Sequence, residues 1–549
     1  MPKHIGAEHE CEVAGFVRSE GTRLVNGEGR EILLRGVGFG NWLLPEGYMW
    51  KFPKEGDRPR RIEAMIEGLI GAEKAGRFWE LYYERYTSEA DIERIAAEGF
   101  NSVRIPINAR FLMEDEEEPL RIKERHLAHI DRMIGWCKDH RLYVILDLHG
   151  APGGQTGANI DDSKRDHPDL FADEKYKRLT VQLWRVLAER YKDEWIVAGY
   201  DLLNEPLPDW FAEYNNRLMP LYKEIVKAIR EVDARHMIIL EGAHWATDWS
   251  VFMEKIDDNL MLQFHKYWSN PDTESLRPYL EKRDEWNVPI FMGEGGENNN
   301  DWYAGAFQLF EDHEISWNFW PWKKLDTRNS PCSIRIPDDW QLLIRYLEDG
   351  ERPDEAVAER ILWEFLDCLP LERCVYHEDV VRSLFRRAPV RVPALFYGYK
   401  GEGVSFAVGA AGRKENPWGF RTQDGTDIRS MESGEERPAF WHGRGNSDQM
   451  LFVQLMEGDW LEYDFSASPS QESRKMALRM KAGPVHGAAD VKVTVNGREA
   501  GSVEITGGVD SWRETGLNIV IPTEPGRLNV RIRAERQAVR LEWVELIAL

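Results

Sequence analysis

The sequence predicts an α/β fold: a (β/α)8 TIM barrel followed by a C-terminal antiparallel β-sandwich of the jelly-roll type. Two patterns predict it. Between about residues 32 and 350, short apolar runs alternate with long amphipathic stretches, as in repeated βα units. From about residue 394, helical periodicity gives way to alternating runs that are separated by glycine-containing turns. We therefore expect two domains, residues 1–390 for the barrel with a helical extension and residues 391–549 for the sandwich.

Eight β-branched and aliphatic runs account for the barrel strands, because eight parallel strands with crossovers close into a barrel. Amphipathic stretches between them predict helices, such as 88–99, where Ser88 is an N-cap, Asp91 stands at the capping-box position and Gly99 stops the helix. The runs are 32–40, 102–107, 143–150, 197–206, 237–244, 260–267, 289–296 and 316–322.

Helical patterns at 340–348 and 353–367 follow the eighth run, and a basic, proline-marked stretch at 386–393 leads into the sandwich. There, runs such as 491–495, 519–521 and 528–532 are separated by Asn-Gly, Gly-Gly and Pro-Gly turns.

The composition excludes several classes of protein. The net charge of −24 argues against nucleic acid and anionic membrane as partners, because the basic surplus that neutralises phosphate is missing. No apolar run approaches the length of about 18 residues that spans a bilayer. We see no secretory signal, and the five cysteines form no CxxC, so the expected compartment is the cytoplasm. The 22 tryptophans are either packing or platforms for flat ligands.

Polar residues end the predicted barrel strands, where the reactive groups of such barrels lie. Two glutamates that close two inner strands are expensive to bury unless function demands it. A pair of carboxylates across a sugar-sized gap is the requirement of glycoside hydrolysis. These strand-end residues are Arg104, His149, Asn204, Glu205, His265, Tyr267, Glu294 and Trp320.

The two glutamates need different environments to act as acid and nucleophile. An Arg and a Tyr near Glu294 would hold it ionised, while Glu205 beside that charge would keep its proton longer. One competing interpretation is a buried salt-bridge network of Glu205 and Glu294 with Arg104. Another is a divalent metal site at His149, Glu205, His265 and Glu294, but the first strand has no HxH, and we expect no metal and no cofactor.

Residues 15–350 resemble glycoside hydrolase family 5. The resemblance implies Glu205 as acid/base, Glu294 as nucleophile, and Trp320 as the platform under the sugar. It also implies that Arg104 and Tyr267 orient the nucleophile, that Asn204 donates to the sugar 2-hydroxyl, and that His149 and His265 bind the substrate. Segments 35–46, 149–157 and 317–323 are most similar to the exo-β-1,3-glucanase and β-glucosidase branch, which implies that Glu46 binds hydroxyls of the terminal sugar. Segment 158–163 is one residue longer than that branch's pattern, and Asn41 replaces its usual Gly.

Residues 395–549 resemble a family 6 carbohydrate-binding module in the segments 420–428, 457–464, 491–499 and 540–546. Arg540 stands where sugar-binding members have an Asn, and Trp512 is the candidate aromatic partner. Sugar binding and a purely structural role, including a homo-oligomer contact, both stay open for this part.

Together these features predict a retaining, exo-acting β-glucosidase or exo-β-glucanase that hydrolyses short oligosaccharides or glucosides, with carboxyl groups of Glu205 and Glu294 about 5 to 5.5 Å apart. The alternatives are an endo-β-glucanase or mannanase with an open cleft, and a non-catalytic carbohydrate-binding protein.

Overall fold

The computed structural model describes residues 12–414, 419–431, 440, 451–466, 475–508, 511–520 and 527–549. The chain divides into two compact units. The first comprises residues 1–266, 279–296 and 316–377, and the second comprises 267–278, 297–315 and 378–549. Each unit is therefore built from several pieces of the chain.

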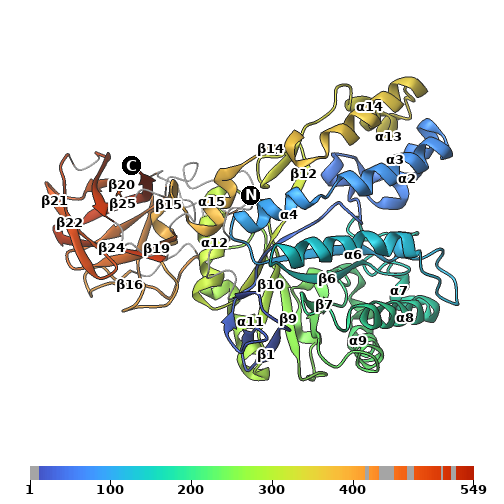
Figure 1. The fold of residues 1–549 in the computed structure, drawn as a ribbon. Helices are drawn as coiled ribbons and strands as arrows, with labels where there is room; N and C mark the ends of the chain where they lie inside the picture. Colours follow the sequence, from blue (N-terminus) through green and yellow to red (C-terminus); the bar gives the residue numbers. More distant parts are fainter. Residues whose placement is uncertain are drawn as a thin grey trace. The chain divides into compact units, whose positions relative to one another are not determined.

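A closed barrel of eight parallel strands forms the centre of the first unit, in the order β10-β11-β4-β5-β6-β7-β8-β9 (Figure 1). This confirms the predicted TIM barrel and places all eight runs in it. The strands are β4 (Arg35–Gly38), β5 (Ser102–Asn108), β6 (Tyr143–Gly150), β7 (Val197–Asp201), β8 (Met237–Glu241), β9 (Leu260–His265), β10 (Ile290–Gly296) and β11 (Ser316–Trp320).

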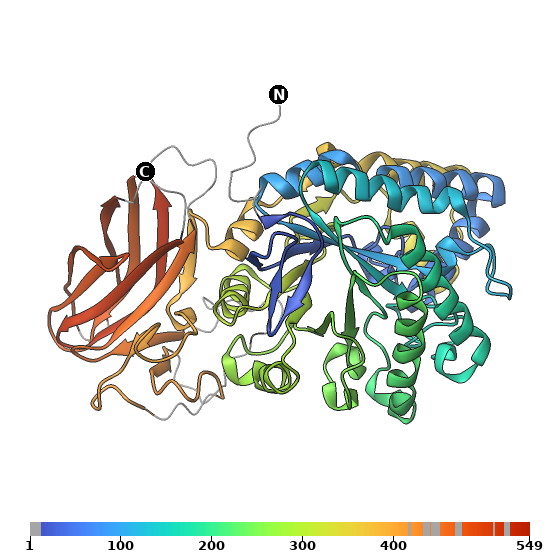
Figure 2. The same ribbon diagram turned by 60° about the horizontal axis from the view of Figure 1, so that its bottom comes forward.

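The first run is shorter in the barrel than its sequence suggests. Glu31–Ile32 forms β3, which joins β1 (Arg18–Glu20) and β2 (Arg23–Val25) in a separate three-stranded sheet. The main-chain N–H of Ser19 donates to Oδ1 of Asn259, the residue before β9. This small sheet therefore lies at the amino-terminal ends of the barrel strands (Figure 2).

Helices connect the strands and surround the barrel (Figure 1). Ser88 and Asp91 form the predicted capping box at the start of α4. One crossover differs from the expected βα pattern, because only two single-turn helices, α10 and η4, join β8 to β9. The connecting helices are α2 (Pro59–Ile70), α3 (Ala72–Arg85), α4 (Glu89–Ala97), α5 (Ala109–Leu112), α6 (Glu124–Asp139), α7 (Asp169–Ala172), α8 (Glu174–Tyr191), η3 (Asp209–Tyr214), α9 (Asn215–Arg230), α10 (Ala243–Ala246), η4 (Trp249–Val251), α11 (Thr273–Trp286) and α12 (Asn300–Asp312).

A helical extension follows the barrel and confirms the two helical patterns predicted there, as α13 (Gln341–Asp349) and α14 (Glu355–Cys368). A small sheet accompanies them. Its strands are β12 (Lys323–Leu325), β13 (Cys332–Ile334) and β14 (Val375–Tyr376), and the short helices η1 (Gly47–Trp50), η2 (Lys54–Gly56) and η5 (Leu371–Arg373) complete the first unit.

Antiparallel sheets make up most of the second unit and confirm the predicted β-sandwich. One has the order β17-β18-β25-β20-β23, with β15 on β25, and the other β16-β19-β24-β21-β22. Its elements are α15 (Glu378–Phe385), β15 (Val390–Pro393), η6 (Ala394–Phe396), β16 (Phe406–Ala407), β17 (Asp427–Ser430), β18 (Leu451–Leu455), β19 (Trp460–Ser466), β20 (Lys475–Pro484), β21 (Ala489–Val495), β22 (Arg498–Ile505), β23 (Arg513–Val520), β24 (Arg527–Arg536) and β25 (Val539–Ala548).

Local sequence explains these strands. In β19 and β21, buried and half-buried residues alternate, as expected where one face packs on a core. Asn496 and Gly497 connect β21 to β22 with positive φ angles of 49° and 74°, which a two-residue hairpin turn requires. The predicted Pro-Gly turn at 525–526 lies outside the described residues. Among the described helices, none is both long and apolar enough to cross a membrane.

Candidate active site

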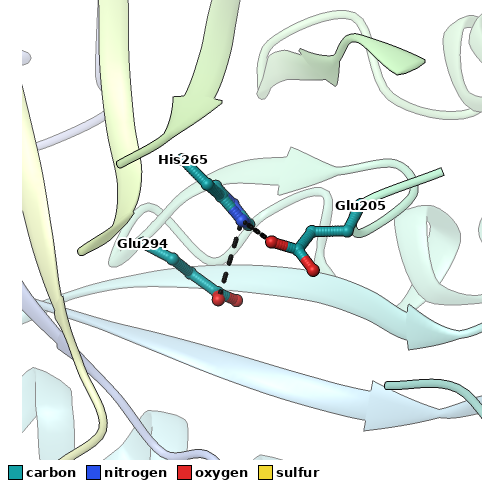
Figure 3. Close-up of side chains that lie close together, drawn as sticks. All are labelled: Glu205, His265 and Glu294. Atoms are coloured by element: carbon teal, nitrogen blue, oxygen red, sulfur yellow. Dashed lines mark hydrogen bonds and ion pairs between the residues drawn. The ribbon is translucent and has the colours of Figure 1, made fainter. Parts of the chain in front are cut away.

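The two predicted catalytic glutamates meet at the carboxyl-terminal end of the barrel. Glu205 lies four residues beyond β7, and Glu294 lies within β10. His265, the last residue of β9, stands between them: its Nδ1 is 2.6 Å from Oε1 of Glu205 and 3.6 Å from Oε2 of Glu294 (Figure 3). One atom from each of the three side chains lies within 4.8 Å of the others. The structure therefore brings together residues that the sequence places on three separate strands.

Arg104 joins the nucleophile candidate to a buried set of acids. Its guanidinium contacts Oε1 of Glu294 through Nη1, and Nη2 lies 2.9 Å from Asp201, 3.1 Å from Asp147 and 3.1 Å from Glu241. Glu294 thus belongs to a buried salt-bridge network with Arg104, as one competing interpretation expected. Glu205 instead pairs with His265. A guanidinium can serve so many acceptors because its donors form a planar fork.

Burial has a larger effect on the pKa values of the acids around Arg104 than the neighbouring charges have. It raises the pKa of Glu294 above its ordinary value, although His265 and Arg104 act in the opposite direction. Burial also raises the pKa values of Asp147 and Asp201, which further acids reinforce. Proximity to Arg104 alone therefore does not hold Asp147 and Asp201 ionised, because desolvation disfavours the charged form.

His265 and His149 respond oppositely to the same surroundings. Burial lowers the pKa of His265, but Glu241, Glu294 and Glu205 together raise it well above the ordinary value. Burial lowers the pKa of His149 to about 4. The surrounding carboxyl groups therefore favour the protonated form of His265, whereas burial favours the neutral form of His149.

The metal alternative does not fit this charge state well. Glu205, His265 and Glu294 are close enough to share a cation. However, a metal ligand must be a neutral imidazole, and these carboxylates favour the protonated ring of His265. The proton supplies the positive charge that a metal would bring.

His149 and Asn204 form a chain of hydrogen bonds beside the glutamates. Nδ1 of His149 lies 2.7 Å from Oδ2 of Asp147, and its Nε2 accepts from Nδ2 of Asn204 at 3.4 Å. Oδ1 of Asn204 accepts from Arg104 at 2.8 Å. The Asn204 amide is therefore oriented with its NH₂ group on the His149 side, and its predicted donation to a sugar hydroxyl stays a prediction.

Glu46 and Trp320 approach the same histidine. Glu46 follows β4 and is 2% exposed, with Oε1 3.9 Å from Nε2 of His149. The Trp320 ring lies parallel to that of His149, with centroids 5.3 Å apart, and its Nε1–H donates to the hydroxyl of Tyr48 at 3.1 Å. The structure thus groups both residues with His149, and adds Tyr48, which the sequence analysis missed. Their contacts with sugar stay predictions.

Tyr267 belongs to the second compact unit, so its predicted role as an orienter of Glu294 stays a prediction. Six further tryptophans follow the ends of strands, and most of them are core residues. Trp42, Trp50, Trp249 and Trp302 are buried, whereas Trp245 is half-buried and Trp268 is 46% exposed.

Three buried residues of the site escaped the sequence analysis: Asp147, Asp201 and Glu241. Glu241 is the last residue of β8, just as Glu294 lies near the end of β10. The rule that reactive residues lie at the carboxyl ends of barrel strands could therefore have identified it. Asp147 lies two residues before His149, and alternate residues of a strand share a face. Asp201 is the last residue of β7, so its position at a strand end could have identified it in the same way.

The longer segment at 158–163 is held by one carboxylate. Asp161 accepts hydrogen bonds from the main-chain N–H groups of Thr156 at 2.7 Å, Gly157 at 3.1 Å and Ser163 at 2.9 Å. Arg58 donates to the hydroxyl of Ser163 at 2.6 Å. The loop after β6 is therefore ordered by the carboxylate of Asp161, which lies within this longer segment.

In the sandwich, the guanidinium of an arginine lies over the aromatic candidate Trp512. The guanidinium of Arg540, which replaces the Asn of sugar-binding modules, lies 4.9 Å from the ring centroid of Trp512. Phe452 meets the same indole edge-on at 5.3 Å. Sugar binding by this unit, and its resemblance to a carbohydrate-binding module, stay predictions.

Comparisons with known proteins agree with this geometry. Residues 65–326 match the family model described as cellulase (glycosyl hydrolase family 5). A β-xylosidase of Phanerodontia chrysosporium is 26% identical over 408 residues, which cover 66% of this chain and 84% of the relative. Endoglucanase C of Acetivibrio thermocellus is 27% identical over 311 residues, covering 45% of this chain and 88% of the relative. A probable glucan 1,3-β-glucosidase A of Neosartorya fischeri is 30% identical over 240 residues, covering 43% of this chain and 56% of the relative.

The barrel, the paired glutamates and these matches lead to the same assignment. The barrel segment is similar to glycosyl hydrolase family 5 over residues 65–326, and the chain is an O-glycoside hydrolase.

Proposed function

We propose that the protein is a retaining, exo-acting β-glucosidase or exo-β-glucanase that removes a terminal β-glucosyl unit from short oligosaccharides or glucosides. The observation that supports the retaining mechanism is that one carboxyl oxygen of Glu205 lies within 4.8 Å of one carboxyl oxygen of Glu294. Retaining enzymes need carboxyl groups about 5 to 5.5 Å apart, whereas inverting enzymes need about 6.5 Å or more to admit a water.

The mechanism is a double displacement. The carboxylate of Glu294 forms a bond to the anomeric carbon while Glu205 gives its proton to the glycosidic oxygen, and the bond between that oxygen and the anomeric carbon breaks. In the second step, Glu205 takes a proton from water, the water oxygen binds the anomeric carbon, and the bond to Glu294 breaks. Arg104 and protonated His265 stabilise the negative charge of Glu294 before it attacks and again as it leaves the anomeric carbon.

Replacing the nucleophile tests this assignment. We expect Glu294→Ala to reduce the rate with 2,4-dinitrophenyl β-glucoside by about 10⁴-fold or more, because the covalent step is lost. Added azide should restore turnover and give the α-glucosyl azide, which NMR of the anomeric proton identifies.

Glu205→Ala is the matched control. Azide should rescue this variant with retained configuration, because the covalent intermediate still forms and azide attacks it. An α-glucosyl azide from Glu205→Ala, or release of α-glucose from a β-glucoside by the wild-type enzyme, would contradict the proposed roles.

We infer glucose as the terminal sugar because segments 35–46, 149–157 and 317–323 resemble the exo-β-1,3-glucanase and β-glucosidase branch. The position of Glu46 beside His149 supports the expectation that Glu46 binds hydroxyls of that sugar. The similarity to a protein named β-xylosidase makes β-xylosides a necessary comparison in the same assay. A panel of aryl β-glycosides, followed by β-1,2-, 1,3-, 1,4- and 1,6-linked disaccharides, measures the preference.

An endo-β-glucanase is the second candidate, favoured by the similarity to Endoglucanase C of Acetivibrio thermocellus. The size of the products separates the two. Release of glucose alone from a β-glucan supports exo action, and release of oligosaccharides from a glucan with a blocked non-reducing end supports endo action.

A further inference from the structure

The carboxylate of Glu241, at the end of β8, touches three parts of the catalytic machinery at once. Oε2 accepts the main-chain N–H of Glu205 at 2.7 Å. Oε1 lies 3.1 Å from Nη2 of Arg104 and 3.5 Å from Nε2 of His265. The side chain is fully buried, and Tyr222 donates to its main-chain oxygen at 2.8 Å. One carboxylate therefore links the acid/base, the arginine of the nucleophile and the histidine between them.

The main chain of Glu205 needs such a partner. Its φ angle is 41°, in the left-handed region that residues with side chains rarely adopt, and that of Leu207 is 55°. Strained backbone persists only where its surroundings hold it. The N–H of Glu205 donates to an ionised carboxylate, which is a stronger bond than one to a neutral oxygen. This hydrogen bond to Glu241 thereby fixes the main-chain position from which the side chain of Glu205 extends.

His265 provides the second connection. Its Nδ1 faces Glu205 and Glu294, and its Nε2 faces Glu241. The other charged or titratable groups that interact with these acids are Arg104, Asp147, Asp201, His149 and Tyr222. His265 and Arg104 lower the pKa of Glu241 despite its burial, so Glu241 remains an anion that favours the proton on His265. The ring then donates from Nδ1 to the carboxyl group of Glu205.

We propose that Glu241 is a positioning residue for the acid/base, which it orients twice, through the main-chain N–H of Glu205 and through His265. This inference rests on the proposed role of Glu205. Glu241 touches no substrate, and it acts on the step in which Glu205 protonates the leaving oxygen.

The dependence on the leaving group tests the proposal. Glu241→Gln keeps a carbonyl oxygen that can accept from Glu205 but removes the charge. We expect kcat/KM to fall by about 100-fold for a phenyl β-glycoside, whose leaving group needs a proton, and by less than about threefold for the 2,4-dinitrophenyl β-glycoside. Equal losses with both substrates, or no loss with either, would overturn the proposal.

Asp233→Asn is the matched control. Asp233 is also a buried carboxylate with a histidine partner, His236 at 2.5 Å, but it precedes β8 rather than following it. Its replacement should leave the leaving-group dependence unchanged. Glu241→Asp, which retains the charge on a shorter side chain, should fall between Glu241→Gln and the wild type, and provides the test if Glu241→Gln does not fold.

A second measurement does not need activity. In ¹⁵N-histidine NMR, with His265 assigned through His265→Asn, Glu241→Gln should lower the pKa of His265 by about one unit or more relative to the wild type. An unchanged pKa would overturn the connection through His265. If the wild type hydrolyses no aryl glycoside, or if Glu205→Ala shows no leaving-group dependence, the proposed function fails, and the titration still decides the role of Glu241.

Discussion

Arg104 shows how a single residue organises a site with more buried negative than positive charge. Asp147, Asp201, Glu241 and Glu294 all approach its guanidinium, and His265 is the second cation of the cluster. Since isolated buried carboxylates are expensive, some of them keep protons, as the raised pKa values of Asp147 and Asp201 indicate. The identity of the strand-end residues was predictable from sequence, but their protonation was not.

Asp233 behaves in the opposite way at the other end of the barrel. Burial raises its pKa, but hydrogen bonds from His236, the N–H of Arg235 and Tyr200 lower it to about 2. The folded-state pKa thus lies below the unfolded value of about 3.9, so the charged carboxylate stabilises the fold above that pH and the contribution disappears as the pH falls toward 2.

We therefore expect Asp233→Asn to lower the free energy of unfolding at pH 6 by on the order of 1 kcal/mol, because the charge that His236 and Arg235 stabilise is lost. Urea unfolding at several pH values measures it. The difference from the wild type should shrink between pH 4 and pH 2, and a difference that stays constant over this range would contradict the explanation.

At the scale of elements, the end of β4 makes room for the indole of Trp320. A Cβ on Gly40 would lie 2.6 Å from Cζ2 of Trp320, and one on Gly38 would lie 2.6 Å from its Cε3. These glycines are required by close approach, since neither has a positive φ angle. The first strand therefore determines where the last strand places its aromatic ring.

Gly40→Ala should push Trp320 out of its position against His149 and reduce kcat/KM for aryl glycosides by about tenfold or more, because misplacement of a substrate-positioning group weakens catalysis. Gly76→Ala is the matched control. Gly76 lies in α3 with nothing within 4 Å of an added Cβ, so the change should leave activity unaltered and stabilise the helix by about 0.5 to 1 kcal/mol. Equal activity of both variants would show that Gly40 does not act through Trp320.

At the scale of the molecule, α12 belongs to the second compact unit although it connects the barrel strands β10 and β11 along the chain. Every residue from Trp302 to Phe310 is buried. The absence of a side chain at Gly305 lets the ring of Phe396 pack against α12, since a Cβ on Gly305 would lie 2.8 Å from Cδ1 of Phe396. Arg527 forms an ion pair with Glu311, which is also in α12. The division into folding domains at residues 1–390 and 391–549 stays a prediction.

Truncation after residue 390 tests that boundary. Removing Phe396 and Arg527 uncovers α12, and exposed apolar surface costs about 25 cal/mol per Å². We expect the midpoint of thermal unfolding to fall by about 10 °C or more, with loss of aryl glycosidase activity because β10 carries Glu294. A truncated chain with the midpoint and kcat of the full chain would show that residues 1–390 are an independent domain.

The eight strands, the capping box at Ser88, the change to a sandwich and the two glutamates could be predicted from the amino-acid sequence. They follow from periodicities of two and 3.6 residues, from the residue types that cap helices and from the strand-end rule. The remaining features depend on the folded arrangement. Closure of the barrel brought Glu241 against Glu205, Arg104 and His265, and burial determined which acids keep protons and which tryptophans are core. Contacts between residues far apart in the chain, and the desolvation they cause, leave no periodic signal in the sequence.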